Sequence, residues 1–368
     1  MTFIARNDMR PSEVLMHVGH GKTGSSFLQQ SLARSTHVLR RAGIIYPETP
    51  EVLKAQSGQI TSGNCSASHI VREFDSLKTT CAQGERLLFS SEALYKDICS
   101  DDSVLRIFAS EGIPIKVLLF IRDPIEAFPS QYGQSVKRQG YFGTADDYID
   151  SLELSRLHAV RLELFLEKCR AHNVQVIIKN YTRNKMNLVG CLEAFLGLTP
   201  NSLHLDQVKV NRSMSASELE FLRSVNRIFG KQVGSELSQR WCVELPHIPE
   251  DKVWPSKEYL VKLIEAVRPS MEEYDARADG IHWQRYDVTF DDAVASQSLF
   301  EGNKSQFFQA PPLTSEQAEI AETVICQFAA RSAHKGYFSN QRVGSIRRGL
   351  QRLSRRGQGF LYAARNRR

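Results

Sequence analysis

An α/β fold, in which a mostly parallel central sheet is flanked by helices, is predicted from three features of the sequence. Short apolar runs alternate with longer amphipathic stretches over residues 14–200. The first apolar run ends in a glycine-rich turn that leads into an amphipathic stretch. Beyond residue 200 the amphipathic segments follow one another without such runs. Alternation of this kind is typical of a parallel sheet with helices on both faces. We therefore expect one domain over 1–340, with an α/β core at 14–200 and a mainly helical part at 201–340.

The expected elements follow from the apolar period of each segment. Short apolar runs predict strands at 14–18, 43–46, 86–90, 116–121 and 174–179. Between them, amphipathic stretches predict helices near 25–41, 124–138, 155–172 and 185–197. The C-terminal part has amphipathic segments at 215–230, 256–277 and 315–334. The small polar residues of 57–69 favour a mobile loop.

The first strand, the first helix and the turn between them have the pattern of a phosphate-binding loop. Residues 14–26 read VLMHVGHGKTGSS. Glycines let the backbone approach an anion, and the N–H groups at the start of the next helix point toward it. Lys22 adds a full positive charge. The sequence therefore predicts that a phosphate-bearing ligand binds near the N-terminus.

The loop matches the ATP-binding pattern G-x-x-x-x-G-K-[ST] only in part. Gly21, Lys22 and Thr23 supply the end of that pattern, but Met16 stands where its first glycine should be. ATP-binding loops also work with a carboxylate that holds Mg²⁺ at the end of a second strand. The corresponding strand here ends in Arg122. A P-loop kinase or NTPase that uses ATP and Mg²⁺ is thus an alternative reading.

A second anion site is predicted after the buried strand 116–121. That strand runs into Arg122, Asp123 and Pro124. Asp123 followed by Pro124 fits the N-cap and first position of a helix. Arg122 at the strand tip and Ser130 in the second helical turn can then converge on one phosphate. Because ligands bind at the carboxyl ends of such strands, two anion sites there fit a nucleotide with phosphates at both ends of its ribose.

These motifs resemble those of sulfotransferases that use 3′-phosphoadenosine 5′-phosphosulfate (PAPS). GHGKTGSS is similar to the 5′-phosphosulfate loop of that family, and IRDPIEAFPS to its 3′-phosphate motif, an arginine and a serine separated by seven residues. Residues 178–198 resemble the strand, tyrosine and helix that follow, except that Thr182 replaces the usual acidic residue. The resemblance covers roughly residues 14–200.

The resemblance implies a P-loop NTPase-like sulfotransferase fold and transfer of a sulfuryl group from PAPS to a hydroxyl, leaving 3′,5′-ADP. It implies a carbohydrate or glycolipid acceptor and no metal. The donor would be bound by the following residues: Gly21, Lys22, Thr23, Gly24, Ser25, Ser26, Arg122, Ser130 and Tyr181. Tyr181 would pack on adenine, although a plain core tyrosine fits its position too.

Catalysis is expected to depend on positioning and electrostatics. Lys22 would neutralise the charge that builds on the leaving group. Glu92 follows an apolar strand, and a glutamate after the corresponding strand is the base in glycan sulfotransferases. Another register places Ser90 at that position, and Glu92 can also be only a carboxylate at a helix N-terminus. His20, inside the turn, is the rival base, whereas His17 fits a structural role within its strand.

Composition places the chain among ordinary soluble proteins. Hydrophobic residues make up 42% and charged residues 24%, and no apolar run approaches the roughly 20 residues of a membrane span. Residues 1–10 lack the apolar region of a signal peptide. The seven cysteines are scattered without C-x-x-C spacing, which indicates reduced thiols and no structural zinc. We expect a cytoplasmic protein.

The net charge of +6 belongs to a C-terminal tail, residues 341–368. Its last 27 positions, 342–368, hold nine arginines and no acid, and the remainder of the chain carries −3. Apolar residues lie between the arginines at near-helical spacing. The pattern fits a solvated tail, and it also fits a basic amphipathic segment that docks to the anionic inner membrane surface or to a polyanion. No motif for nucleic acid is present. A non-enzymatic binder of anionic glycans or membranes through this tail is a further alternative.

Overall fold

The structure is a computed structural model that describes residues 10–21, 23–58, 61, 63–122, 124–152, 161–204, 212–277 and 313–334. Four parts of the sequence discussed above lie outside the described residues. They are Lys22, which is expected to neutralise charge on the leaving group; Asp123, the expected N-cap; the basic tail 341–368; and the start of the helix expected at 155–172. The chain divides into two compact units. Unit 1 comprises residues 1–127, 152–210 and 264–287, and unit 2 comprises the rest.

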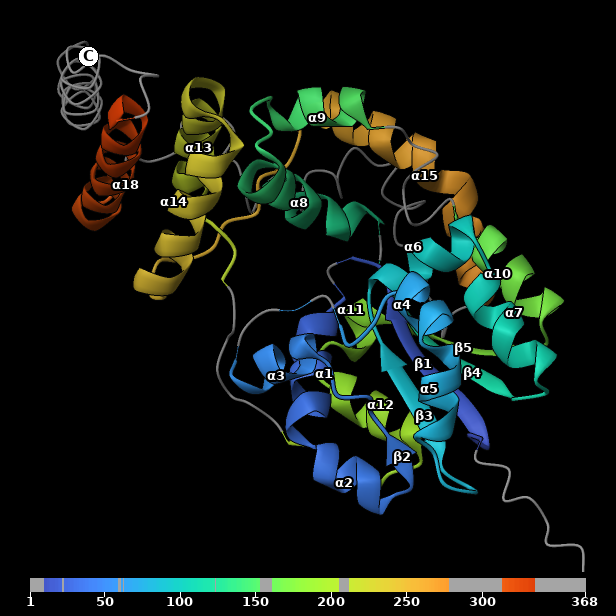
Figure 1. Cartoon of the computed structure of the whole chain (residues 1–368). Coiled ribbons are helices and arrows are strands. Elements are labelled where there is room, and N and C mark those ends of the chain that lie inside the picture. Colours follow the sequence, from blue (N-terminus) through green and yellow to red (C-terminus); the bar gives the residue numbers. More distant parts are fainter. Residues whose placement is uncertain are drawn as a thin grey trace, which may run out of the picture. The chain divides into compact units, whose positions relative to one another are not determined.

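Unit 1 contains a five-stranded parallel sheet, as predicted (Figure 1). Its strands lie in the order β2-β3-β1-β4-β5, and all four pairings are parallel. The bounds are β1 (Glu13–Gly19), β2 (Ile44–Ile45), β3 (Arg86–Ser90), β4 (Ile115–Ile121) and β5 (Gln175–Asn180). Because parallel strands end at the same edge, the segments that follow β1, β3, β4 and β5 meet at the carboxyl edge.

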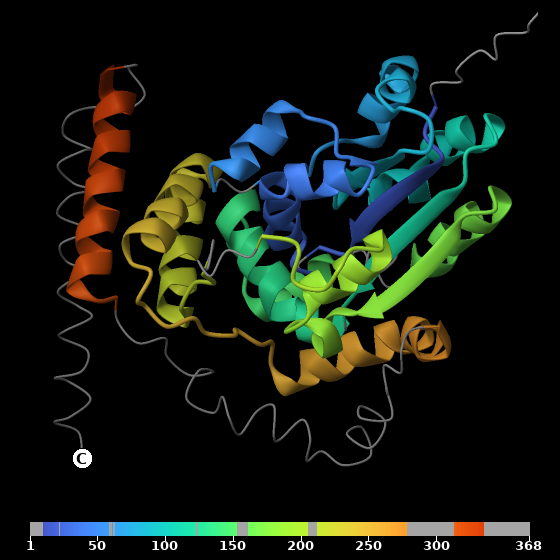
Figure 2. The ribbon, with the colours of Figure 1, turned by 90° about the horizontal axis from the view of Figure 1, so that it is seen from below.

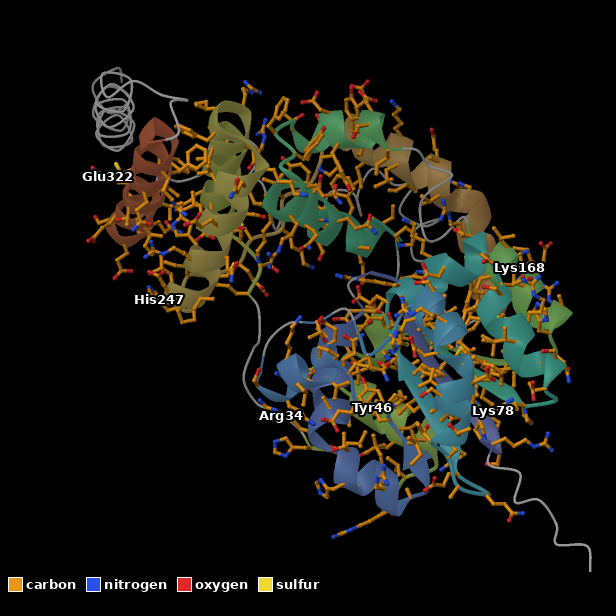
Figure 3. The ribbon with its side chains drawn as sticks, viewed as in Figure 1. Arg34, Tyr46, Lys78, Lys168, His247 and Glu322 are labelled. Carbon is orange, nitrogen blue, oxygen red and sulfur yellow. The ribbon has the colours of Figure 1, made fainter. Side chains whose placement is uncertain are left out.

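Helices cover both faces of this sheet (Figures 1 and 2). On one face, α1 (Ser25–Arg34) and α12 (Leu188–Leu196) share an apolar core with β1, β3 and β4. That core includes Leu15, Leu88 and Phe120, and Tyr46 (labelled in Figure 3) lies among them with 8% of its surface exposed. This two-sided burial explains why β1 and β4 read as nearly continuous apolar runs.

The remaining helices of unit 1 are short. Three of them, α6 (Ala93–Ser100), α7 (Ser103–Ser110) and α10 (Leu162–Ala171), pack beside strands β1, β4 and β5. The others are α2 (Thr36–Arg41), α3 (Pro50–Gln56), α4 (Ala67–Arg72), α5 (Phe74–Thr79) and α11 (Tyr181–Asn184). The single helix expected at 25–41 is divided at Ser35, which has φ −105 and ψ 20. The Ser35 hydroxyl accepts a hydrogen bond from the backbone N–H of His204 at 2.7 Å.

The segment predicted as a mobile loop, 57–69, is instead fastened to β3 where the structure describes it. Gly63 forms an antiparallel bridge with Ser91. The Asn64 side chain accepts from the Ser90 N–H at 2.9 Å and donates to the Leu88 carbonyl at 3.3 Å. The Ser66 hydroxyl then caps α4. The Asn64 side chain therefore holds this segment against β3, although the composition of residues 57–69 favours a loop.

Unit 2 is helical in its described part. It contains most of α8 (Pro124–Gln134), the π-helix η1 (Ser135–Gln139) and α9 (Ala145–Ser151). It also contains α13 (Ala216–Phe229), α14 (Lys231–Glu244), the first part of α15 (Lys257–Arg277) and α18 (Ser315–His334). Three of them, α13, α15 and α18, match the amphipathic segments expected at 215–230, 256–277 and 315–334, whereas α14 was not expected. No helix within the described ranges combines the length and apolar character that crossing a membrane requires.

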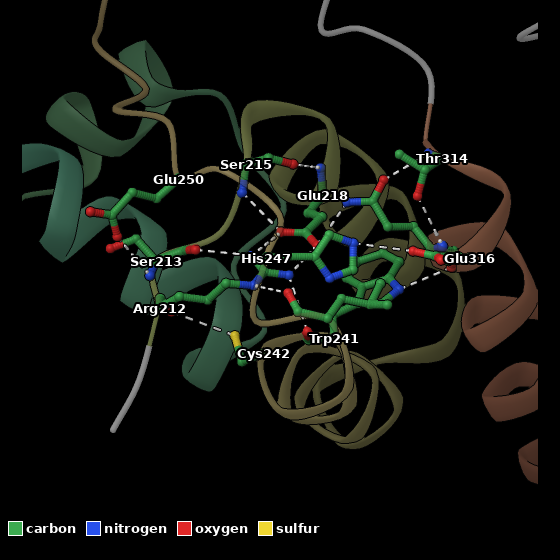
Figure 4. Close-up of polar contacts among 12 residues, drawn as sticks. Arg212, Ser213, Ser215, Glu218, Trp241, Cys242, His247, Glu250, Thr314 and Glu316 are labelled. Atoms are coloured by element: carbon green, nitrogen blue, oxygen red, sulfur yellow. Dashed lines mark hydrogen bonds and ion pairs between the residues drawn. The ribbon is translucent and has the colours of Figure 1, made fainter. Parts of the chain in front are cut away.

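A buried polar network joins three helices of unit 2 (Figure 4). The Arg212 guanidinium donates to both carboxylate oxygens of Glu218, at 2.7 and 2.6 Å. Glu218 also accepts from the Gln317 side chain at 2.9 Å, and the Gln317 carbonyl accepts from the Trp241 indole at 2.9 Å. The Glu218 side chain is 0% exposed and that of Arg212 is 4% exposed. The network therefore anchors α18 to α13 and α14 through paired, buried groups.

Candidate functional site

The glycine-rich loop connects the end of β1 to the start of α1. Gly24 is the N-cap of α1 and has φ +77, a left-handed conformation that glycine adopts without strain. A Cβ on Gly19 would lie 2.6 Å from Thr23 Oγ1 and 3.0 Å from Ser25 Oγ. The loop is thus folded closely on itself, and only glycine fits there. Since Gly24 has no side chain to cap α1 and the first turn of α1 has no acidic residue, this helix end favours an anion.

Thr23 holds the turn from inside. Its side chain is 0% exposed, and Thr23 Oγ1 donates to the carbonyl of His20 at 2.7 Å. The N–H of His20 in turn donates to the carbonyl of Phe120 in β4 at 3.1 Å. The loop is therefore tied to β4 at the carboxyl edge of the sheet. Of the hydroxyl residues in the motif, Ser25 is buried at 1% exposure and Ser26 is half-buried.

Arg122, which follows β4, is held in place before any ligand binds. Its Nη2 donates to the carbonyl of Glu126 in the first turn of α8 at 3.1 Å. Its guanidinium lies over the ring of Tyr181, 5.3 Å from the centroid, a cation–π contact. Tyr181 begins α11 directly after β5. Arg122 and Tyr181 are both half-buried.

The Tyr181 ring also borders the glycine-rich loop. A Cβ built on Gly24 would lie 3.4 Å from Tyr181 Cε2. The ends of β1, β4 and β5 thus bring the loop, Arg122 and Tyr181 together within unit 1. One face of the Tyr181 ring is covered by Arg122, so a base stacked on Tyr181 would have to use the other face.

The sequence analysis missed Glu126, whose carboxylate lies beside this cluster. Thr182 Oγ1 donates to Glu126 Oε2 at 2.6 Å. The Asn180 side chain accepts from the N–H groups of Thr182 and Arg183 at 2.9 and 3.4 Å, which fixes the start of α11. Thr182, noted above where an acidic residue is usual, therefore binds a carboxylate that comes from α8. The available signal was the IRDPIEAF motif itself, in which Glu126 lies four residues after Arg122.

Ser130 lies further along α8, on its half-buried side, and belongs to unit 2. Arg122 belongs to unit 1. Their convergence on one phosphate stays a prediction.

The candidate base Glu92 lies at the same edge, where β3 passes into α6. It occupies the N-cap position of α6 and is half-buried. The neighbouring Ser91 is fixed on both sides: its N–H donates to the His17 carbonyl at 3.1 Å, and its hydroxyl accepts from the Ala93 N–H at 3.2 Å. Ser90, the alternative in the other register, is 0% exposed and contacts His17. Glu92 therefore has the more accessible position of the two.

The two histidines of the motif are both buried. His17 is 0% exposed, and its Nδ1 lies 2.8 Å from Ser90 Oγ. Burial lowers the pKa of His17 to about 4, so it is neutral at neutral pH. His20 is 3% exposed, with its ring edge-on to Tyr95 at 4.7 Å between centroids. This packing favours a structural role for His17 and leaves His20 less accessible than Glu92.

Among the described residues, no group of three or more His, Cys, Asp or Glu side chains is arranged to hold a metal ion. The features that fit an anionic ligand are the helix end at Gly24 and the guanidinium of Arg122. These residues fit a nucleotide that carries more than one phosphate.

Solved structures that resemble the chain in fold include those of two sulfotransferases and a retinol dehydratase. A sulfotransferase from Alicyclobacillus acidocaldarius is 16% identical, with a TM-score of 0.33, over 62% of this chain and 94% of that one. A sulfotransferase domain from the curacin biosynthetic pathway is 10% identical, with a TM-score of 0.29, over 70% and 98%. A retinol dehydratase in complex with retinol and PAP is 11% identical, with a TM-score of 0.30, over 73% and 84%. No family model and no curated protein matches the chain. At these sequence identities and TM-scores the likeness does not extend to a function. A proposal about function must therefore be supported by the residues of the site.

Proposed function

We propose that this protein is a PAPS-dependent sulfotransferase. The observation that carries the proposal is the meeting of the glycine-rich loop, Arg122 and Tyr181 at one edge of the sheet. A ligand at this edge that spans the loop and Arg122 needs two separated anionic groups. The 5′-phosphosulfate and 3′-phosphate of PAPS meet that need, and the adenine between them can contact Tyr181.

The contact made by Thr23 argues for this reading over an ATP-dependent kinase. In an ATP-binding loop the hydroxyl that follows the lysine binds Mg²⁺. Here Thr23 Oγ1 is buried and donates to the His20 carbonyl instead. In addition, the strand that would supply a Mg²⁺ carboxylate ends in Arg122, which attracts an anion and repels a cation.

In the proposed reaction, Glu92 removes the proton of the acceptor hydroxyl as its oxygen attacks the sulfur in line. The bond between that sulfur and the 5′-phosphate oxygen breaks, which leaves 3′,5′-ADP and a sulfate ester. Lys22 and the N–H groups of the loop stabilise the charge that grows on the leaving phosphate. The acceptor is proposed to be a carbohydrate or glycolipid in the cytoplasm, in line with the sequence motifs.

A binding experiment that needs no acceptor tests the proposal. By calorimetry on the full chain, 3′,5′-ADP should bind more tightly than 5′-AMP or ATP with Mg²⁺. Arg122→Ala should weaken 3′,5′-ADP by roughly 10- to 150-fold, the loss of one charge-assisted contact, and 5′-AMP much less. Arg72→Ala, which removes an exposed arginine paired with Glu73, is the matched control. Equal losses for both nucleotides would exclude a 3′-phosphate site, and tightest binding of ATP with Mg²⁺ would favour the kinase.

A further inference from the structure

Lys137 and Cys242 form a close pair in unit 2 that the proposed sulfuryl transfer does not use. Lys137 lies in the π-helix η1 and Cys242 near the end of α14. Lys137 Nζ lies 3.1 Å from Cys242 Sγ, and the Lys137 residue is only 7% exposed. The Cys242 thiol also donates to the carbonyl of Arg212 at 3.6 Å.

The backbone around Lys137 is fixed by its neighbours. The Lys137 carbonyl accepts from Ser235 Oγ of α14 at 3.1 Å. The Asn226 side chain donates to the carbonyls of Val136 and Tyr141, at 2.8 and 3.0 Å. The amine therefore approaches the sulfur as part of a packed arrangement of η1 on α13 and α14, and π-helical turns are frequent at functional sites.

The surroundings of Cys242 differ from those of four thiols of unit 1. Burial raises the pKa of Cys99 to about 11 and that of Cys169 to about 12, and it raises the pKa of Cys65 and Cys81 as well. Cys242 is partly exposed and has an amine at hydrogen-bonding distance. Reactive thiols occur in partly exposed, electropositive surroundings, whereas thiols in apolar surroundings are inert.

We propose that Cys242 and Lys137 form a modification site for peroxides, in which oxidation of the thiol leads to a covalent S–N link between the two side chains. In the first step the Cys242 thiolate attacks hydrogen peroxide, which gives a sulfenic acid and one hydroxide, or water after protonation. In the second step the Lys137 amine, having lost its proton to water, attacks the sulfur and displaces the hydroxyl as a second water. The sulfur loses two electrons in total and the peroxide gains them.

The link would fasten η1 to α14 through two residues that lie 105 positions apart in the sequence. Because η1 follows α8 directly, oxidation would restrain the helix that carries Ser130. Cross-links that close long loops restrict the unfolded chain most. This inference does not depend on the proposed sulfuryl transfer, since all its residues and its chemistry belong to unit 2.

The test is site-resolved mass spectrometry of the reduced full chain after treatment with hydrogen peroxide. The expected product is a pair of peptides, one with Lys137 and one with Cys242, joined and lighter than the reduced pair by two hydrogens. A thiol reductant should release it. In Lys137→Met the joined pair should be absent, and dimedone should capture Cys242 as the sulfenic acid. Alkylation of Cys242 by iodoacetamide should also slow by roughly tenfold, because the neighbouring cation is lost.

The controls separate this chemistry from general oxidation. Arg138→Met removes the adjacent cation and should leave the cross-link intact, and Cys242→Ser should abolish it. Cys99 serves as an unreactive thiol within the same sample. The proposal is overturned if wild-type Cys242 reacts no faster than Cys99, or if dimedone captures it equally in wild type and Lys137→Met. A joined pair that is heavier than the S–N product by one oxygen, and that a thiol reductant still releases, would contain an N–O–S link and would overturn the S–N step.

Discussion

At the scale of single residues, burial decides which groups near the loop can exchange a proton. His17 is enclosed between strands and stays neutral, with Nδ1 beside Ser90. His20 is packed against Tyr95. Glu92 is half-buried at the N-cap of α6. The accessible carboxylate is therefore the better candidate for the base.

His17 predicts a loss of stability in mild acid. Its pKa is lowered from 6.5 to about 4 by burial, so the unfolded chain takes up this proton at a higher pH than the folded chain does. The contribution of neutral His17 to the free energy of unfolding is complete above pH 6.5. It decreases as the pH drops toward 4, by about 3 kcal/mol in total. Urea unfolding between pH 7 and pH 4 measures it. His17→Asn, whose amide can still meet Ser90, should lose this dependence and keep only that of the carboxylates; equal slopes in both proteins would contradict the prediction.

Glu92→Gln keeps the shape of the side chain and removes its basicity. We expect kcat for transfer of labelled sulfate from PAPS to simple glycosides to fall by about 10²- to 10⁴-fold, the usual contribution of a general base. Binding of 3′,5′-ADP should stay unchanged, which shows that the fold and the donor site are intact. Near-normal turnover in Glu92→Gln together with an inactive His20→Ala would assign the role to His20.

At the scale of elements, the connection from β3 to α6 is held by a segment distant in sequence. Gly63 forms a bridge with Ser91, directly after β3, and the Asn64 side chain hydrogen-bonds both the Ser90 N–H and the Leu88 carbonyl. The same connection carries Glu92. The position of the Glu92 carboxylate therefore depends on contacts made by residues 63 and 64. These two residues belong neither to the glycine-rich motif nor to the motif that contains Arg122.

Gly63→Ala should be more destabilising than an ordinary change of glycine to alanine. Gly63 has φ +119, and a Cβ there would lie 2.1 Å from the Ser90 carbonyl oxygen. Gly84 also has a positive φ, +85, but a Cβ there meets nothing within 4 Å. Gly84→Ala should cost about 1–2 kcal/mol from backbone strain alone. Denaturant unfolding should show a clearly larger loss for Gly63→Ala; losses of the same size would mean that residue 63 is not packed against β3.

The sheet and several of its helices could be predicted because their signals are local, whereas the short helices α3, α4, α5 and α7 were not predicted. Each strand is a short apolar run, and each helix shows its own apolar period. The helix break at Ser35 depends instead on the N–H of His204, and the pairing of Thr182 with Glu126 joins two motifs 56 residues apart. The hydrogen bond from the Thr23 hydroxyl to the His20 carbonyl likewise depends on how the loop folds in three dimensions. Such contacts leave no periodic trace in a single sequence, so the candidate site could be located but not detailed.

At the scale of the whole molecule, the two compact units are stabilised in different ways. Unit 1 depends on an apolar core on each face of a parallel sheet. Unit 2 adds a buried ion pair, Arg212–Glu218, to its helix packing, and Gln317 extends that pair to α18. Removing one partner of such a pair leaves the other charge buried and uncompensated.

Arg212→Ala should therefore destabilise unit 2 by about 3–5 kcal/mol. Hydrogen exchange should show faster exchange throughout α13, α14 and α18, while the strands of unit 1 keep their protection. The double variant Arg212→Met with Glu218→Leu replaces both charges by apolar groups and should recover much of the stability. A single variant that exchanges like wild type in α18 would show that the pair does not hold that helix.

The central place of β1 in the sheet has a consequence for synthesis of the chain. The neighbours of β1 are β3 and β4, which end about 70 and 100 residues later in the sequence. During translation at about 5–20 residues per second, β1 must wait on the order of 5–20 s before residue 121 has been made. Until then β1 lacks its neighbour β4, and the glycine-rich segment lacks the Phe120 carbonyl that accepts from the N–H of His20. The nucleotide proposed above is therefore expected to stabilise the fold only after β4 has paired with β1.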